Sequence, residues 1–384
     1  MNKLFLKMYI LVFLALGSVS ITSQTWPYDL TMEMQNAAIA IAENWVDDRN
    51  PEKQDWAWGE GVLAYGLIRT YDWSGNNQYY DFVHDYITYH SNENKDIEWS
   101  DHTSPAIAGL YIKKNIHPGQ NYSLCDDVID YIMDAPRTIN QGLLLHLGYR
   151  ADNWAYKMLD LPDAWIDSLF HITPSLVLKS NLTGDNQYIN EAANQIKLFI
   201  QNLQDTNSKL FAHAYNDYPD NEVIPDFSNN EFWARGNGWM ICALVELLAE
   251  LPQSHPDYPY LLSKAVEVEE ALRNNQGDDG RFHTLLTKSN SYYETAGTAL
   301  ILYAMAYGYE LGIFGSETYN SVLDGAQGLL DNTLDWHHND TQADVTKTSI
   351  GTNPTPGLYR FVPKQSQVSY GVGAWLMFAS IIAD

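Results

Sequence analysis

Two acidic residues lie where helices are expected to begin, and both could do acid–base chemistry; Asp167 is flanked by apolar side chains and Asp101 by polar ones. Asp167 lies in the run Trp165-Ile-Asp-Ser-Leu-Phe170, and Asp101 is followed by His-Thr-Ser-Pro105. A carboxylate buried among apolar side chains is costly as an anion, so its pKa rises and it can hold a proton near neutral pH. Asp167 is therefore a candidate general acid. For both residues a plain helix-capping role is the alternative.

The most unusual stretch of the chain combines aromatic residues, an arginine and two glycines. It reads Phe232-Trp-Ala-Arg-Gly-Asn-Gly-Trp239 and contains the candidate binding residues Trp233, Arg235, Asn237 and Trp239. Trp rings stack on sugar rings, and an Arg holds a carboxylate through two parallel hydrogen bonds. Just upstream, the polar loop His213-Ala-Tyr-Asn-Asp217 adds a His, a Tyr and a carboxylate. A surface loop is the alternative for His213.

Other polar residues near expected helix starts have simpler interpretations. Glu294 precedes Thr295 and is expected to cap a helix or pack at the rim, since an acid is favourable at a helix N-terminus. The last loop contains Arg360, Lys364 and Tyr370, a local set of cations in an acidic chain, although solvated basic residues are the alternative. The adjacent pair His337-His338 is not a ligand spacing on one helix face, and nucleotide-binding, serine-hydrolase and zinc-protease motifs are absent from the sequence. No metal or cofactor is expected.

Helical periodicity dominates the chain, and strand signals are scarce. Six apolar segments rich in small residues are expected to be inner helices: Trp58–Tyr71, His102–Lys113, Asp167–Lys179, Gly236–Leu251, Thr295–Leu311 and Gly371–Ala383. Six amphipathic segments alternate with them and are expected to face solvent: 31–46, 78–90, 122–134, 187–204, 258–274 and 318–333.

A short pattern recurs between the two sets of segments. Gly75-Asn-Asn-Gln-Tyr79 matches Gly184-Asp-Asn-Gln-Tyr188 closely, and Gly315-Ser-Glu-Thr-Tyr319 matches more loosely. Gly suits the position after a helix, where φ is positive. The repeated unit is therefore an inner helix, a Gly turn and an outer helix. Six inner and six outer segments predict an all-α (α/α)₆ barrel, with one domain over 25–384 and an irregular helical array as the alternative. The loops that enter the inner helices should converge at one mouth, where function is expected.

Composition and charge exclude several classes of partner. The chain has 384 residues, and its 22 basic and 48 acidic residues give a formal net charge of 22 − 48 = −26. Such acidity argues against a nucleic acid or an anionic membrane surface as partner. Two cysteines, Cys125 and Cys242, exclude a disulfide scaffold and are expected to be buried thiols.

The N-terminus has the pattern of a secretory signal peptide over 1–24. Lys3 and Lys7 precede the apolar run Met8–Gly17, and small residues follow at Ser18–Ser20. The apolar run is too short to span a bilayer, so we expect an exported protein, periplasmic or secreted. Residues 1–24 contain two lysines and no acid, so their removal changes the formal net charge to −26 − 2 = −28. Such an acidic surface suits a saline habitat.

These motifs together resemble the unsaturated uronyl hydrolases of glycoside hydrolase family 105, which is related to family 88. The resemblance runs in order from about residue 30 to the C-terminus. It rests on the Asp167 and His213 stretches, Trp233-Ala-Arg-Gly-Asn-Gly-Trp239, Glu294-Thr-Ala-Gly297 and Gly371-Val-Gly-Ala374. It implies an (α/α)₆ barrel, in agreement with the helix pattern.

The resemblance also implies a reaction. The substrate carries a C4=C5 double bond left by a polysaccharide lyase; a carboxylic acid protonates C4, and water adds at C5. By resemblance, Asp167 is the general acid and then the base, and Asp101 shares the proton of the pair. Arg235 and Trp239 hold the unsaturated uronate, His213 contacts it and Trp58 forms a further wall. The implied partner is an anionic unsaturated oligosaccharide, and the enzyme is expected to be a monomer or a homodimer.

Three departures from the family pattern bear on the second sugar. His171 stands where the family usually has Met, Tyr215 where it usually has Trp, and Gly142–Lys157 match poorly. His171 is either a packed helix residue or a sensor of a charged group such as sulfate. Unsaturated glucuronyl-rhamnose 3-sulfate from ulvan is the preferred substrate, ahead of rhamnogalacturonan and then glycosaminoglycan products. An ordinary two-carboxylate glycosidase and a glycan-binding toroid are the rival readings.

Overall fold

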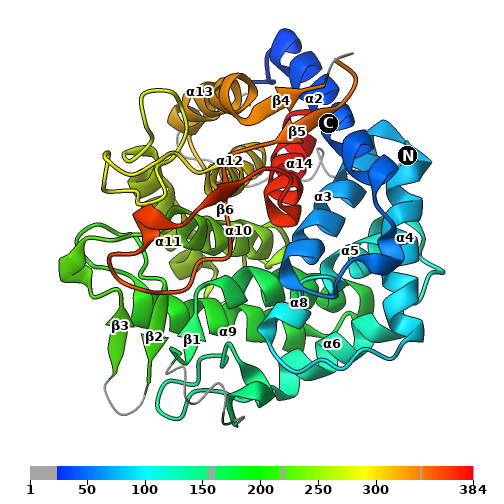
Figure 1. Ribbon diagram of the computed structural model, residues 1–384. Coiled ribbons are helices and arrows are strands. Elements are labelled where there is room, and N and C mark those ends of the chain that lie inside the picture. Colours follow the sequence, from blue (N-terminus) through cyan, green and yellow to red (C-terminus); the bar gives the residue numbers. More distant parts are fainter. Residues whose placement is uncertain (1–23, 153, 155–160, 218–220, 338–339, 384) are drawn as a thin grey trace, which may run out of the picture.

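The computed structural model describes residues 24–152, 154, 161–217, 221–337 and 340–383 (Figure 1). The expected signal peptide, apart from Gln24, lies outside the described residues. An inner layer of helices consists of α3 (Trp58–Ser74), α5 (Ala106–Tyr111), α8 (Asp167–Thr183), α10 (Ala234–Glu250), α12 (Thr295–Glu310) and α14 (Ser369–Ala383). Each inner helix packs on the next, and α14 packs on α3, so the ring is closed.

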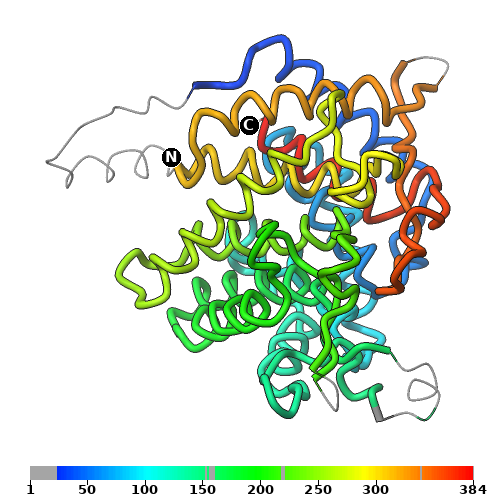
Figure 2. The backbone as a smooth tube through the Cα atoms, turned by 90° about the vertical axis from the view of Figure 1, so that its left-hand side faces the viewer, coloured from blue at the N-terminus to red at the C-terminus, as the bar shows by residue number. Residues whose placement is uncertain are grey.

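An outer layer covers this ring. It consists of α2 (Tyr28–Asp48), α4 (Asn77–Asn92), α6 (Ser123–Asp134), α9 (Asn186–Leu203), α11 (Tyr258–Arg273) and α13 (Ser316–Thr333). Helix α2 packs against α14 and α13, so the first described helix completes the layer beside the last ones; Figure 2 shows α2 in blue next to α13 in orange. The expected all-α (α/α)₆ barrel is confirmed.

The sequence explains both the tight inner ring and its turns. Helix α14 is buried from Tyr370 to Ala383, as its continuous apolar run requires. A Cβ added at Gly373 would lie 2.4 Å from the carbonyl oxygen of Val62, so glycine lets α14 approach α3. Gly75 and Gly184 end α3 and α8 with φ of 68° and 72°, as the repeat pattern predicted.

Two local expectations differ from the structure. Gly315 is not the residue that ends an inner helix: its φ is −85° and it precedes α13, whereas Gly312 takes the positive φ of 72°. The second inner helix begins at Ala106 and not at His102. A 3₁₀ turn, η2 (Ser100–His102), precedes it, because Pro105 has no N–H to continue a helix across it. A π turn, η3 (Ile112–Ile116), follows α5.

Three small antiparallel sheets connect the helices in the described part of the chain. The first has the order β1 (Ala164–Trp165), β2 (Ala214–Asn216), β3 (Glu222–Ile224). The others pair β4 (Leu334–Trp336) with β5 (Ala343–Val345), and β6 (Thr348–Ser349) with β7 (Lys364–Gln365). Cys125 and Cys242 are buried free thiols, as expected. No helix within the described ranges has the length and apolar character needed to cross a bilayer.

Candidate active site

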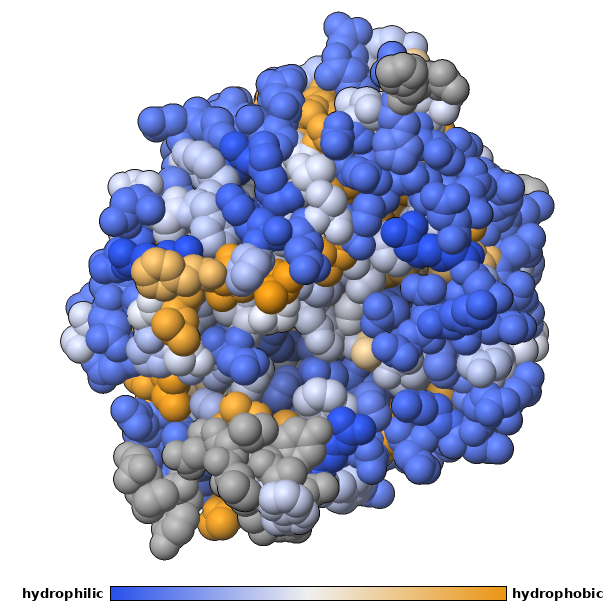
Figure 3. Space-filling view, in the orientation of Figure 1, coloured by the Kyte–Doolittle hydropathy of each residue, from blue (hydrophilic) through white to orange (hydrophobic). Residues whose placement is uncertain are grey.

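A cavity of about 230 Å³ lies where the N-terminal ends of the inner helices converge. Figure 3 shows a hollow near the centre of a largely hydrophilic face. The cavity brings together five of the residues expected from the sequence, which come from the starts of α3, α8 and α10 and from the turn before α5. The lining residues are Trp58, Trp99, Asp101, His146, Leu147, Leu161, Trp165, Asp167, His171, Trp233, Arg235, Gly351, Thr352 and Asn353.

The β1–β2 ladder places His213 against Asp167. Trp165 of β1 pairs with Ala214 of β2, and the N–H of Ile166 donates to the carbonyl of His213 at 2.9 Å. Consequently Nε2 of His213 lies 3.1 Å from Oδ2 of Asp167. The residue before α8, Ile166, makes no side-chain cap, so the carboxyl of Asp167 faces the cavity and His213 instead of closing the helix end.

Asp101 lies between two buried imidazoles. Its Oδ1 is 3.6 Å from Nε2 of His146 and 3.7 Å from Nδ1 of His171. His146 is held by the hydroxyls of Ser100 and Ser168, at 2.8 Å and 3.1 Å from its Nδ1. Asp101 sits inside the 3₁₀ turn, and it does not cap α5, whose N-terminal residue is preceded by Pro105.

The two carboxyls have opposite pKa shifts. Burial raises the pKa of Asp101 from 3.8 to about 8, and the neighbouring Asp167 adds to this shift while Arg150 opposes it. Burial acts in the same direction on Asp167, but the charge and hydrogen bond of His213, with smaller effects of His171 and His146, outweigh it and lower its pKa to about 2. The expectation that burial would raise the pKa of Asp167 is therefore wrong for the free enzyme, because the β1–β2 ladder supplies a hydrogen-bond donor.

The buried histidines beside Asp101 are neutral at ordinary pH. Burial lowers the pKa of His146 to about 3, with Asp167 opposing the shift, and it lowers that of His171 to about 4 against the same opposition. Between about pH 4 and 8 the carboxyl pair therefore carries one proton, which resides on Asp101 while Asp167 is ionised. The site thus contains both a carboxylic acid and a carboxylate.

Arg235 lies in the cavity wall, but most of its hydrogen-bond donors are already bonded to other residues of the protein. Its Nη1 donates to the carbonyl and hydroxyl of Ser349 at 3.1 Å and 2.7 Å, and its Nη2 donates to the carbonyl of Ile350 and the hydroxyl of Thr352, both at 3.1 Å. Glu294 is 3.5 Å away and, as expected, caps α12. Arg235 therefore anchors the segment 349–352, part of which lines the cavity.

The remaining residues that we expected at the site form three groups: one lines the cavity, one is buried behind it and one is exposed outside it. Trp58 lines the cavity, stacks on Tyr370 with ring centroids 4.2 Å apart, and meets Trp239 edge-on at 6.3 Å. Trp239 and Asn237 are fully buried, and the Asn237 amide is bonded to the backbone of Phe211 and Trp233. Arg360 and Lys364 are exposed and do not line the cavity, so the structure does not bring this pair into the site.

Several cavity-lining residues have a buried nitrogen without a hydrogen-bond partner. These atoms are Nε1 of Trp99 and of Trp233, Nε of Arg235, and both ring nitrogens of His171. The indole and guanidinium nitrogens can only donate. These atoms are themselves buried, so none of them presents a free donor to the cavity.

Tyr359, His146 and Trp99 belong to the site and were not singled out from the sequence. The hydroxyl of Tyr359 lies 3.0 Å from Nδ1 of His213, the nitrogen opposite the one that faces Asp167. The aromatic ring of Trp233 covers the same imidazole at 4.2 Å. Tyr359 adjoins the expected loop that begins at Arg360, and no motif marks it.

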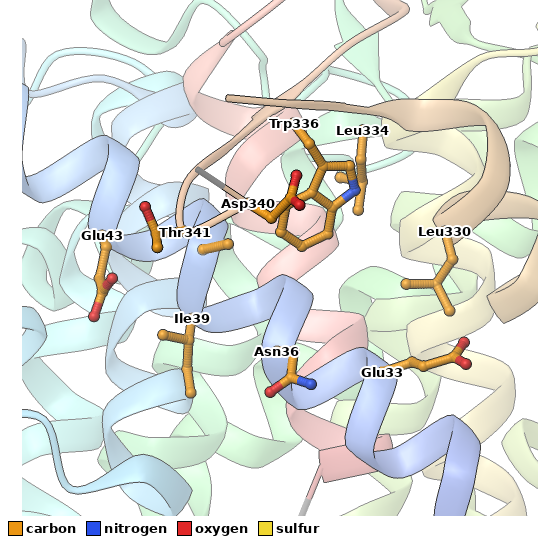
Figure 4. Close-up of a pocket in the computed structure, with 10 residues that line it drawn as sticks. Glu33, Asn36, Ile39, Glu43, Leu330, Leu334, Trp336, Asp340 and Thr341 are labelled. Atoms are coloured by element: carbon orange, nitrogen blue, oxygen red, sulfur yellow. The ribbon is translucent and has the colours of Figure 1, made fainter. Parts of the chain in front are cut away.

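A larger hollow of about 670 Å³ lies on the outside of the barrel, away from these residues. Figure 4 shows that α2 contributes Glu33, Asn36, Ile39 and Glu43, and that Trp336, Leu334, Asp340 and Thr341 approach from the β4–β5 region. Its charged lining residues are three carboxylates, which would repel an anionic sugar. Within the described ranges no group of His, Cys, Asp and Glu has a metal-binding arrangement.

The chain is similar to enzymes that act on unsaturated uronyl oligosaccharides. It is 21% identical over 334 residues to the unsaturated rhamnogalacturonyl hydrolase YesR of Bacillus subtilis, with 84% of this chain and 88% of that protein covered. It is 23% identical over 338 residues to an unsaturated 3S-rhamnoglycuronyl hydrolase of Alteromonas sp. (strain LOR), with 84% and 76% covered.

Similarity to solved structures and to a family profile agrees with the fold. A crystal structure described as a possible member of family 105, from Salmonella enterica serovar Paratyphi A, has a TM-score of 0.75 at 21% identity, covering 92% of this chain and 93% of that chain. The profile of Glycosyl Hydrolase Family 88 matches residues 31–382. With nearly the whole described barrel inside this match, the chain belongs to glycosyl hydrolase family 88.

Proposed function

We propose that this protein is an unsaturated uronyl hydrolase that hydrates the C4=C5 double bond at the non-reducing end of lyase products. The observation that carries this proposal is the buried carboxyl pair with one proton, Asp101 and Asp167, at the wall of one cavity. Hydration of a vinyl ether needs a proton donor and a proton acceptor in one site, and the pair supplies both. Membership of a glycosyl hydrolase family supports the same reaction class.

In the proposed reaction Asp167 gives a proton to C4, and the positive charge develops at C5 beside the ring oxygen. A water molecule attacks C5 and returns its proton to the carboxylate of Asp167. C5 then carries a hydroxyl group and the ring oxygen, and this hemiketal opens and releases the next sugar. Asp101 supplies the proton of the pair: with C4 of the anionic uronate against Asp167, the pKa of Asp167 rises more than that of Asp101, and the proton passes from Asp101 to Asp167. His213 holds Asp167 in place through its Nε2.

The proposed substrate is unsaturated glucuronyl-rhamnose 3-sulfate, a product of ulvan lyase. Two observations support it: the relative from Alteromonas is named an unsaturated 3S-rhamnoglycuronyl hydrolase, and the acidic chain suits a saline habitat. Unsaturated galacturonyl-rhamnose from rhamnogalacturonan is the second candidate, favoured by the name of the Bacillus relative. Export by the N-terminal segment is part of the proposal, since both polymers are outside the cell.

Ultraviolet absorbance of the C4=C5 bond tests the proposal. The purified protein is added to two oligosaccharide pools, one made by ulvan lyase and one by rhamnogalacturonan lyase. We expect absorbance to fall in the ulvan pool and the Asp167→Asn variant to leave it unchanged. A fall only in the rhamnogalacturonan pool would replace the proposed substrate. No fall in either pool, with a folded protein, would contradict the uronyl hydrolase assignment for these substrates and favour a glycan-binding role.

A further inference from the structure

The proposed substrate carries two anionic groups, a uronate and a sulfate, and the cationic side chains already described offer them few free donors. Arg235 lines the cavity, but both of its Nη atoms are bonded to residues 349–352. Its Nε is buried and has no partner. Arg360 and Lys364 are exposed, and neither lines the cavity. A cationic group for the sulfate therefore has to come from another part of the cavity edge.

Arg150 supplies such a group. It belongs to the 3₁₀ turn η4 (Gly148–Asp152), and its backbone N–H donates at 2.9 Å to the carbonyl of Leu147, which lines the cavity. Its guanidinium carbon lies 4.7 Å from the ring centroid of Trp99, another lining residue. Its positive charge also lowers the pKa of Asp101 against the larger effect of burial. Arg150 thus lies at the edge of the cavity and acts on its interior.

The guanidinium of Arg150 is held in place and still has free donors. Its Nε and Nη2 lie 2.9 Å and 2.7 Å from Oε2 of Glu98, while the group rests on the ring of Trp99. In the described part of the chain Nη1 has no hydrogen-bond partner, and it is not a buried atom. The side chain is 25% exposed, so Nη1 can donate to a ligand at the mouth. The Glu98 side chain is 46% exposed, so solvent screens its charge and does not let it cancel that of Arg150.

The size of the cavity directs the second sugar toward this edge. Its volume of about 230 Å³ is below the roughly 300 Å³ at which pockets for larger organic ligands begin, so it holds one sugar ring. With the unsaturated ring against Asp167, the second sugar extends toward the mouth. We propose that Arg150 is a specificity-determining residue, which binds the sulfate of the second sugar through Nη1.

This inference rests on the proposed function and names the group that selects its substrate. Arg150 lies within Gly142–Lys157, the segment that departs from the family pattern. A guanidinium suits a sulfate, because its planar N–H groups match the spacing of oxyanion oxygens. The uronate is the other possible ligand, but its C4 and C5 must lie against Asp167, whereas Arg150 acts from the edge. A second sugar without sulfate would leave Nη1 without a ligand, so the enzyme should prefer the sulfated product.

The test compares two substrates on the full protein at constant ionic strength. One is the unsaturated disaccharide made by ulvan lyase, and the other is the same disaccharide after removal of its sulfate. In Arg150→Gln we expect KM for the sulfated form to rise roughly tenfold, the effect of one charged hydrogen bond, and KM for the desulfated form to stay within about twofold. Arg150→Lys keeps the charge but loses the planar group, so its KM for the sulfated form should rise less.

Arg273→Gln is the matched control. The Arg273 side chain is 23% exposed and pairs with Glu269 and Glu317, and it lies on the outer helix α11. This variant loses an equivalent ion pair outside the cavity, so both KM values should equal those of wild type. In Arg150→Gln, an equal rise for both disaccharides would mean that Arg150 acts on the uronate or on the carboxyl pair. No rise for either would mean that it contacts no ligand, and each of these two results would overturn the proposal.

Calorimetry separates this inference from the proposed function. Asp167→Asn should bind both disaccharides without turnover, and it should bind the sulfated form more tightly. Adding Arg150→Gln to this variant should remove the preference, whereas equal affinities before that change would contradict the proposal. If wild type hydrates neither disaccharide, the proposed function fails, and the calorimetric preference alone decides whether Arg150 binds the sulfate.

Discussion

Replacement of Asp101 by asparagine should stabilise the protein while it abolishes turnover. Asp101 is buried, and its pKa is raised from 3.8 to about 8 by burial and by Asp167. A carboxyl with a raised native pKa stabilises the native state most below its unfolded value, and this stability is lost as pH rises from 3.8 to about 8. At about 1.4 kcal/mol per unit, roughly 4 kcal/mol is lost by pH 7. An amide of the same shape does not titrate and avoids this loss.

Asp167→Asn is the matched variant, and it should lower the free energy of unfolding, whereas Asp101→Asn should raise it. The pKa of Asp167 is lowered to about 2, because His213 outweighs the effect of burial, so its stabilising effect is present above 3.8 and is lost only as pH falls through about 2. Its replacement should cost roughly 2 kcal/mol, equally at every pH from 6 to 9. The two asparagine variants should therefore lack activity alike and differ in stability.

Thermal unfolding of wild type and both variants at pH 6, 7, 8 and 9 separates these effects. The difference in free energy of unfolding between Asp101→Asn and wild type should widen by roughly 1.4 kcal/mol per pH unit up to about pH 8 and then level off. The difference for Asp167→Asn should stay constant. A pH-independent difference for Asp101→Asn, or a variant less stable than wild type at pH 8, would refute the assignment of the proton to Asp101.

Three further results are expected. Arg235→Lys should lower stability by roughly 2 kcal/mol and raise KM several-fold, because an ammonium cannot keep the four bonds to residues 349–352; an unchanged melting temperature would argue against the anchoring role. Treatment with EDTA should leave kcat unchanged, and a loss restored by a divalent cation would contradict the expectation of no metal. Mass spectrometry of the exported protein should place its first residue after Ser20 or Gln24, and an intact Met1 outside the cytoplasm would refute cleavage.

The barrel was predictable because its signals are local. Apolar periodicity identifies an inner helix, and a glycine with positive φ at 75 or 184 marks where it turns outward. The same local patterns placed Asp101, Asp167 and Trp233 near inner-helix starts, and the closed ring then brings those starts together. The prediction that Gly315 ends an inner helix was wrong because a glycine can precede a helix as well as follow one. The residues around Gly315 do not distinguish the two positions.

The contacts that tune the site were not predictable in the same way. His146 lies 46 residues from the Ser100 it bonds, and Tyr359 lies 146 residues from His213, both in irregular segments without periodicity. The pKa of Asp167 depends on such a contact: from the sequence alone, burial was the only visible influence, and it has the wrong sign. The donors of Arg235 were likewise assigned to a ligand, because the segment that occupies them, residues 349–352 from the end of β6 onward, leaves no clear trace in the sequence.

The low pKa of Asp167 in the free enzyme is compatible with its proposed work as an acid, because the relevant pKa is that of the complex. A uronate in the cavity adds a second negative charge beside the ionised Asp167 and the protonated Asp101, and like charges in a low-dielectric site favour protonation. The substrate thereby raises the affinity of Asp167 for the proton that Asp101 already holds. When the product leaves, His213 again favours the ionised form. An anionic substrate is thus part of the acid–base cycle, and a neutral sugar in the same cavity would find Asp167 ionised.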